Sequence, residues 1–119
     1  MNAVLGTIEY GANGVVSQVH PPVLKTMKAK ANNGILAAGL VVAKDSNGDL
    51  VAYNPGGTAP VNAAVGVLVQ DCDTATDNAA VVLRHGTVVL NKLKVGSGTP
   101  GETDLAALEA LGIFAVAGN

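Results

Sequence analysis

The chain has 119 residues, enough for one compact domain and an arm, because domains usually comprise about 100 to 150 residues. Only 13% of the residues are charged and the formal net charge is -2, so the sequence offers no basic face of the kind that nucleic-acid binding requires. The longest apolar stretch, residues 35–43, is about half of the roughly 20 residues of a membrane span, so we expect a soluble protein, made in the cytoplasm, with no membrane partner.

Residues 1–33 differ from the rest of the chain and are predicted to form an extended N-terminal arm. They show no sustained hydrophobic period, and the turn-forming residues 11–14 interrupt them. The pair Pro21-Pro22 cannot donate backbone hydrogen bonds and favours polyproline geometry. Residues 7–10 and 14–17 are each suited to a short strand if an edge is supplied. We therefore expect the arm to become ordered against a partner.

Residues 34–119 are predicted to form a β-rich domain. Short β-prone runs alternate with turn residues, as is typical of a small, mostly antiparallel sheet. The predicted strands are residues 35–43, 49–53, 64–70, 79–85 and 87–95. Between the first two, Asn47-Gly48 is expected to supply the positive φ angles of a tight hairpin.

One helix is predicted near the end of the sequence, followed by a strand at residues 113–117. Thr99 has the spacing of a capping box with Pro at the first helical position, and Thr103 is a competing cap. Gly112 is placed to end the helix. The leucines that share one helical face are Leu105, Leu108 and Leu111. The predicted fold class is therefore α+β and β-rich, with one C-terminal helix and an extended N-terminal arm.

No catalytic, cofactor-binding or metal-binding residue is predicted. The residues suited to nucleophilic or acid–base catalysis are Cys72, His20 and His85, and no spacing joins them into a catalytic group. So few His and Cys residues also argue against a zinc site. We expect Cys72, as the one cysteine, to behave as a small hydrophobic residue.

Two ligand-binding patterns are incomplete. Asp45, Asn47 and Asp49 alternate as the first ligands of a calcium loop do, but Leu50 stands where such a loop needs Gly, and no Glu follows at the twelfth position. The glycines at 96, 98 and 101 match a dinucleotide-binding pattern, but no acidic residue lies about 20 positions further on. A hairpin turn and a strand-to-helix loop explain these residues better.

An alternative function rests on residues 26–29, Thr-Met-Lys-Ala, which resemble the modified-lysine turn of biotinyl and lipoyl carrier domains. In those domains the lysine sits at the tip of a hairpin between two half-domains. Here no strand-rich half-domain precedes Lys28. The alternative is a small β-rich carrier or ligand-binding domain with Lys28 as its modification site.

The order of segments from Gly34 to Phe114, roughly two thirds of the chain, resembles the phage lambda type of head decoration protein. The segments that carry the resemblance are Gly34-Ile35-Leu36-Ala37-Ala38-Gly39, Leu50-Val51-Ala52-Tyr53, Ala64-Val65-Gly66-Val67-Leu68, Ala80-Val81-Val82-Leu83-Arg84-His85-Gly86, Leu105-Ala106-Ala107-Leu108 and Leu111-Gly112-Ile113. They are patterns of apolar residues and glycines, so the argument depends on their order.

The resemblance implies a structural protein rather than an enzyme, with no cofactor. It implies a homotrimer that caps the three-fold and quasi-three-fold positions of an expanded capsid, on the outer surface of the virion, after assembly in the host cytoplasm. In that family the N-terminal arm pairs with a strand edge of the major capsid protein. The arm side chains expected in pockets at that edge are Ile8, Tyr10, Val15 and Val16. Lys25, Lys28 and Lys30 either meet an acidic capsid surface or form a solvated basic stretch.

Overall fold

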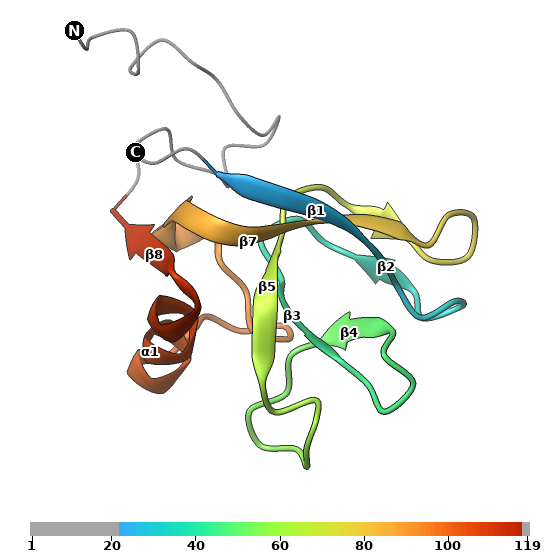
Figure 1. The fold of residues 1–119 in the computed structure, drawn as a ribbon, viewed down its shortest axis with the longest axis horizontal. Helices are drawn as coiled ribbons and strands as arrows, with labels where there is room; N and C mark the ends of the chain where they lie inside the picture. Colours follow the sequence, from blue (N-terminus) through green and yellow to red (C-terminus); the bar gives the residue numbers. More distant parts are fainter. Residues whose placement is uncertain (1–21, 118–119) are drawn as a thin grey trace, which may run out of the picture.

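The computed structural model of the chain describes residues 22–117 (Figure 1). In chain order, its elements are β1 (Val23–Lys28), β2 (Ile35–Leu36), β3 (Val41–Lys44), β4 (Leu50–Ala52), β5 (Ala64–Leu68), β6 (Cys72–Asp73), β7 (Ala79–Val89), a short 3₁₀ helix (Leu90–Lys92), α1 (Glu102–Leu111) and β8 (Ile113–Val116). The prediction of a β-rich, mostly antiparallel domain with one C-terminal helix is confirmed.

The main sheet has the strand order β1-β7-β5-β3-β4, and β8 pairs in parallel with the last part of β7. Every other pairing along this path is antiparallel. The two edges of the sheet meet where Ala29 bridges to Leu50 and the backbone N–H of Lys30 donates to the Leu50 carbonyl at 3.0 Å. The sheet therefore curls strongly, and the end of β1 lies against β4 (Figure 1).

Each face of this curled sheet carries its own hydrophobic cluster. Adjacent residues of one strand point to opposite faces, so Val82 and Leu83 of β7 belong to different clusters although both are fully buried. The first cluster includes Leu83 and also Leu108 of α1 and Ile113 of β8. The second includes Val82 together with Leu36 and Cys72 of the small β2–β6 sheet. Burial on both faces explains why these strands are apolar throughout.

The prediction of one strand over residues 35–43 is wrong, because the chain turns within it. Gly39 has a φ of 91°, and the Ala38 backbone N–H donates to the Asp71 carboxylate at 2.8 Å. These contacts divide the segment into β2 and β3. The strands predicted at residues 79–85 and 87–95 also differ, since β7 runs through Gly86 without a break and ends at Val89.

The hairpin between β3 and β4 is confirmed, but its turn differs from the prediction. Gly48 has a φ of 85°, whereas Asn47 has no positive φ. The Gly48 N–H donates to the Asp45 carbonyl at 2.9 Å, and the Asp45 N–H donates to the Asp49 carbonyl at 2.8 Å. This arrangement is a three-residue loop in which a single left-handed glycine closes the turn.

Helix α1 begins at neither of the two predicted caps. Its N-cap is Gly101, whose backbone N–H donates to the Asp104 carboxylate at 2.9 Å. The acidic side chain in the first turn thus fixes the start of the helix without a Ser or Thr cap. At the other end Gly112 has a φ of 90° and ends the helix, as predicted. Of the three leucines, Leu108 alone is fully buried.

Candidate interaction surface

The predicted arm is only partly within the described residues. Ile8, Tyr10, Val15 and Val16, and also His20, lie outside them. Residues 23–28, within the range assigned to the arm, form β1 at the edge of the main sheet. Along its length β1 pairs with β7, and Ala29 directly after it is fully buried. The folded part of the molecule therefore begins before residue 34.

Three basic side chains share the face of the sheet that carries the second hydrophobic cluster. Lys25 of β1 is paired with Val82, a member of that cluster. Arg84 follows Val82 by two positions in β7 and therefore points to the same face. In β3, Lys44 follows Val42 of the second cluster by two positions. Lys25, Lys44 and Arg84 are hereafter called the basic rim.

Arg84 is the most constrained member of the basic rim. Its Cδ atom would lie 3.5 Å from a Cβ atom at Gly66, which is an ordinary packing distance, so the arginine stem lies over Gly66 of β5. The guanidinium Nη1 donates to the thioether sulfur of Met27 at 3.7 Å. Arg84 is half-buried, whereas Lys25 and Lys44 are exposed. Packing of the stem and contact with Met27 thus limit the orientations of this guanidinium.

The structure separates the three lysines of the predicted basic stretch. Lys28 lies an odd number of positions from Lys25, so the two side chains point to opposite faces of β1. Lys30 follows the strand and is held by its backbone to Leu50. Lys28 is also the last residue of a strand, paired with Ala79, and not the tip of a hairpin. The geometry on which the carrier-domain alternative depends is therefore not found at Lys28.

Exposed apolar side chains surround the start of β1. Val23 is 54% exposed and Leu24 is 45% exposed. Val23 is paired with His85, and the next residue of β7, Gly86, is paired with the start of β8. Phe114 of β8 is 43% exposed. Val23 shares the face of Lys25 and so lies next to the basic rim, whereas Leu24, paired with Leu83 of the first cluster, points to the opposite face. An exposed apolar side chain beside charged ones is typical of protein-binding surfaces.

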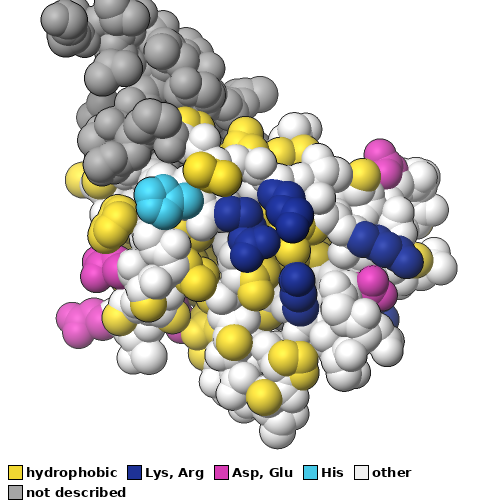
Figure 2. All heavy atoms as spheres, in the orientation of Figure 1, with side chains coloured by type: hydrophobic (Ala, Val, Ile, Leu, Met, Phe, Trp, Pro, Cys, Tyr) yellow, Lys and Arg dark blue, Asp and Glu magenta, His cyan; other side chains and the backbone are white. Residues whose placement is uncertain are grey.

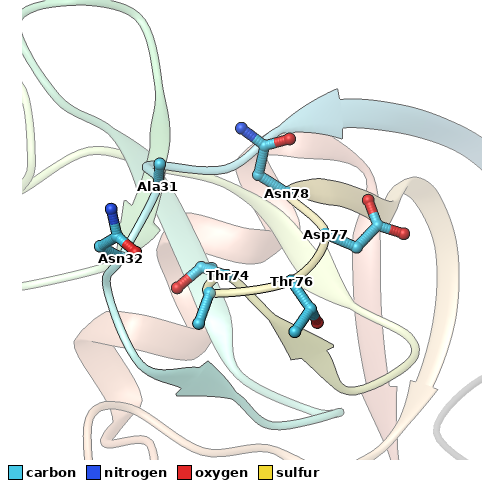
Figure 3. Close-up of a pocket in the computed structure, with 7 residues that line it drawn as sticks. Ala31, Asn32, Thr74, Thr76, Asp77 and Asn78 are labelled. Carbon is cyan, nitrogen blue, oxygen red and sulfur yellow. The ribbon is translucent and has the colours of Figure 1, made fainter.

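An open hollow of about 290 Å³ lies elsewhere, between the segment after β1 and the turn after β6 (Figure 3). The Thr74 hydroxyl in it donates to the Gly34 carbonyl at 2.6 Å and accepts from the Asn33 N–H at 2.7 Å. Figure 3 shows the Asp77 side chain pointing away from Thr74. Because its polar groups hold loops together and do not converge, this hollow has the features of a surface depression rather than a ligand site.

The residues considered for catalysis and metal binding do not come together. Burial first, and then the charges of Asp77 and Asp73, raise the pKa of the Cys72 thiol, which makes it a poor nucleophile. Asp45 Oδ1 accepts hydrogen bonds from two backbone amides of its own turn, at 2.9 Å each. Within residues 22–117 there is no group of three or more His, Cys, Asp or Glu suited to a metal ion. No helix in the same range is long and apolar enough to span a membrane.

Comparison with known protein families gives a match. The family model for the bacteriophage lambda head decoration protein D matches residues 20–116 of the chain. This range includes every strand and helix that the structure describes. No curated protein matches the chain.

Proposed function

The chain belongs to the family of the bacteriophage lambda head decoration protein D, and we propose that it forms trimers on the outer surface of an expanded phage head. Its role is structural, as a decoration protein of the virion capsid. The trimer caps three-fold and quasi-three-fold positions of the shell and stabilises it, after assembly in the host cytoplasm. The observation that carries this proposal is the family match across the whole described fold.

The N-terminal arm is proposed to attach the trimer to the major capsid protein by adding a strand to one of its sheet edges. An extended segment on such an edge gains backbone hydrogen bonds, and alternate side chains enter pockets. Ile8, Tyr10, Val15 and Val16 are the proposed pocket residues. The position of β1 supports this role, because the first part of the arm leads into a strand at the very edge of the sheet.

Trimerisation is proposed to make weak single arms sufficient for stable attachment. Ordering one arm costs about 1 to 2 kcal/mol of backbone entropy per residue, and each hydrogen bond returns only about 0.5 to 1.5 kcal/mol. After the first arm of a trimer has bound, the other two bind at high effective concentration. Lys25, Lys28 and Lys30 are proposed to add contacts to acidic groups on the capsid.

A truncation experiment tests the arm. The truncated chain should begin at residue 22, because deletion up to residue 33 would also remove β1 and the buried Ala29. Light scattering gives the size of both forms, and sedimentation with expanded, undecorated capsids gives their binding. We expect trimers in both cases and capsid binding by the full-length chain alone.

The experiment distinguishes the decoration role from the arm mechanism, because different results would exclude each of them. Equal binding by the truncated and full-length chains would exclude the arm mechanism and leave decoration intact. If the full-length chain did not bind cognate capsids at all, the decoration role itself would be rejected. A monomer in solution that binds as three separate subunits would exclude preformed trimers.

A further inference from the structure

The basic rim lies beside the point where the arm joins the domain. Val23, the first residue of β1, is paired with His85, and His85 directly follows Arg84 in β7. A partner bound by the residues directly before β1 therefore lies close to Arg84. Under the proposed function that partner is the major capsid protein.

The surroundings of the basic rim favour a negatively charged partner. Figure 2 shows most of the visible Lys and Arg side chains gathered near the middle of one face, with another toward the right margin, whereas Asp and Glu side chains lie toward its left and right margins. Within the described part of the chain, Lys25, Lys44 and Arg84 form no ion pair with a carboxylate. Three cations on one sheet face repel one another, and an acidic group placed among them would relieve this repulsion.

We propose that the basic rim binds an acidic segment of the major capsid protein, a proposal that rests on the function proposed above. Arg84 is the central contact, because a guanidinium binds a carboxylate through two parallel hydrogen bonds. Lys25 and Lys44 on either side attract further carboxylates of the same segment. The exposed Val23, two positions before Lys25 and therefore on the same face of β1, supplies apolar contact next to these charges.

Arg84 and Lys44 belong to the basic rim but lie outside the basic stretch of Lys25, Lys28 and Lys30. Arg84 is already held by its packing over Gly66 and its contact with Met27, so little side-chain freedom is lost when it binds. The flexible Lys28 and Lys30 lose more rotamer freedom for each contact. We therefore expect Arg84 to contribute more to binding than Lys25, and Lys25 to contribute more than Lys28, which points to the opposite face of β1.

Charge reversal with a matched control tests the basic rim. The test variants are Arg84→Glu and Lys44→Glu, and the control is Lys92→Glu, which changes the net charge equally. Lys92 is exposed and precedes Leu93, a member of the first cluster on the opposite face of the sheet. A fourth variant, Arg84→Lys, retains the charge but cannot form the bidentate hydrogen bonds of a guanidinium.

The measurement is sedimentation of each full-length variant with expanded, undecorated capsids over a range of salt concentrations. Circular dichroism and light scattering check the folding and the size of each variant.

We expect Arg84→Glu to weaken capsid binding by about tenfold or more at low salt, and to reduce the dependence of binding on salt. Lys44→Glu should weaken binding less, Arg84→Lys should restore part of the loss, and Lys92→Glu should bind like the wild type. A folded Arg84→Glu variant with wild-type affinity and salt dependence would overturn the proposal. So would a variant that changes the size of the oligomer and leaves capsid affinity unchanged, because the basic rim would then be a contact between subunits. A wild-type chain that binds no capsid would instead overturn the proposed function and this inference with it.

Discussion

The carbonyl oxygen of Lys92 occupies the position that a Cβ atom at Gly39 would take. The close approach is held by two hydrogen bonds, from the Gly39 N–H to the Leu68 carbonyl at 2.7 Å and from the Lys94 N–H to the Gly39 carbonyl at 2.9 Å. The turn between β2 and β3 is thereby fixed to β5 and to the segment that follows β7. Glycine is required here for two reasons. A side chain would collide with the Lys92 carbonyl, and a φ of 91° is unfavourable for other residues.

The first prediction compares alanine at Gly39 and at Gly48. Both glycines have a similar positive φ, 91° and 85°, but nothing lies within 4 Å of a Cβ atom at Gly48. Gly48→Ala should therefore cost only backbone strain, about 1 kcal/mol of unfolding free energy. Gly39→Ala adds a steric clash and should cost about 3 kcal/mol or more. Urea unfolding of both variants measures the difference, and equal losses would show that the close approach to Lys92 is unimportant.

The second prediction concerns the attachment of α1 to the sheet. Leu108 is 1% exposed and belongs to the first cluster, whereas Leu111 on the last turn is 37% exposed. Leu108→Ala should lower the free energy of unfolding by about 2 to 5 kcal/mol, because it removes contacts and leaves a cavity. Leu111→Ala is the matched control and should cost less than about 1 kcal/mol. Similar losses in the two variants would mean that the helix packs in another orientation.

Several strands could be predicted from the sequence, but β1, β6 and the arrangement of the sheet could not. Runs of apolar residues bounded by turn residues predict the segments of β4 and β5 and most of β7. The curl of the sheet depends on the bridge between Ala29 and Leu50, which no local pattern encodes. The division of residues 35–43 depends on Gly39 and its contact with a segment more than 50 residues away.

The candidate surface was predictable only in part for the same reason. The alternation of Ala80, Val82 and Arg84 places these side chains on one face of a strand, and that signal is present in the sequence. Arg84 lies near Lys25 only because β1 pairs with β7. This pairing is not visible in the sequence, which groups the lysines only by their positions along the chain. The structure instead groups one of its lysines with Arg84 and Lys44.

The third prediction is that Cys72 reacts slowly in the folded protein. Its side chain is 6% exposed, and the thiol donates to the Asp77 carbonyl at 3.4 Å. Burial, followed by the charges of Asp77 and Asp73, raises its pKa above the ordinary value of 9.0, so little thiolate is present at neutral pH. A thiol reagent at about pH 8 should modify the folded chain at least about 100-fold more slowly than the urea-unfolded chain.

A variant with the cysteine moved to an exposed position is the control for this measurement. Thr76 is exposed on the same turn, so Cys72→Ser combined with Thr76→Cys should react at nearly the rate of the unfolded chain. Fast modification of Cys72 in the folded wild type would show that the β2–β6 region opens readily.

The fourth prediction is a loss of stability at alkaline pH that depends on Tyr53. Burial raises the pKa of the Tyr53 hydroxyl above 10.0, and the charge of Asp104 and a hydrogen bond to its carboxylate raise the pKa further. Above about pH 10 the unfolded chain loses this proton while the folded chain keeps it, so the free energy of unfolding falls as pH rises. Below the unfolded pKa the contribution of Tyr53 is fully present.

Replacement of the hydroxyl should remove this part of the pH dependence. Tyr53→Phe cannot ionise, so its unfolding free energy should fall less steeply than that of the wild type between about pH 9 and about pH 11. Urea unfolding at several pH values in this range measures both slopes. Parallel slopes for the two proteins would show that Tyr53 has the same pKa in the folded and unfolded chains.

The last prediction rests on two buried threonines with opposite hydrogen-bonding states. Thr87 of β7 is 1% exposed, and among the described residues its hydroxyl oxygen is the buried side-chain polar atom without a hydrogen-bond partner. Thr74 is 4% exposed, and its hydroxyl bonds both to the Gly34 carbonyl and to the Asn33 N–H. Valine has nearly the same shape as threonine but no hydroxyl, so the same substitution tests both sites.

At Thr87 the substitution removes a polar group that is buried without compensation, and Thr87→Val should raise the free energy of unfolding by about 1 kcal/mol. At Thr74 it leaves the Asn33 N–H without its acceptor, and Thr74→Val should lower the free energy of unfolding by about 1 to 3 kcal/mol. Urea unfolding monitored by circular dichroism gives both values under identical conditions. Destabilisation by Thr87→Val would mean that this hydroxyl has a partner in solution, and a neutral Thr74→Val would mean that the loop at residues 33 and 34 is held by its backbone bonds alone.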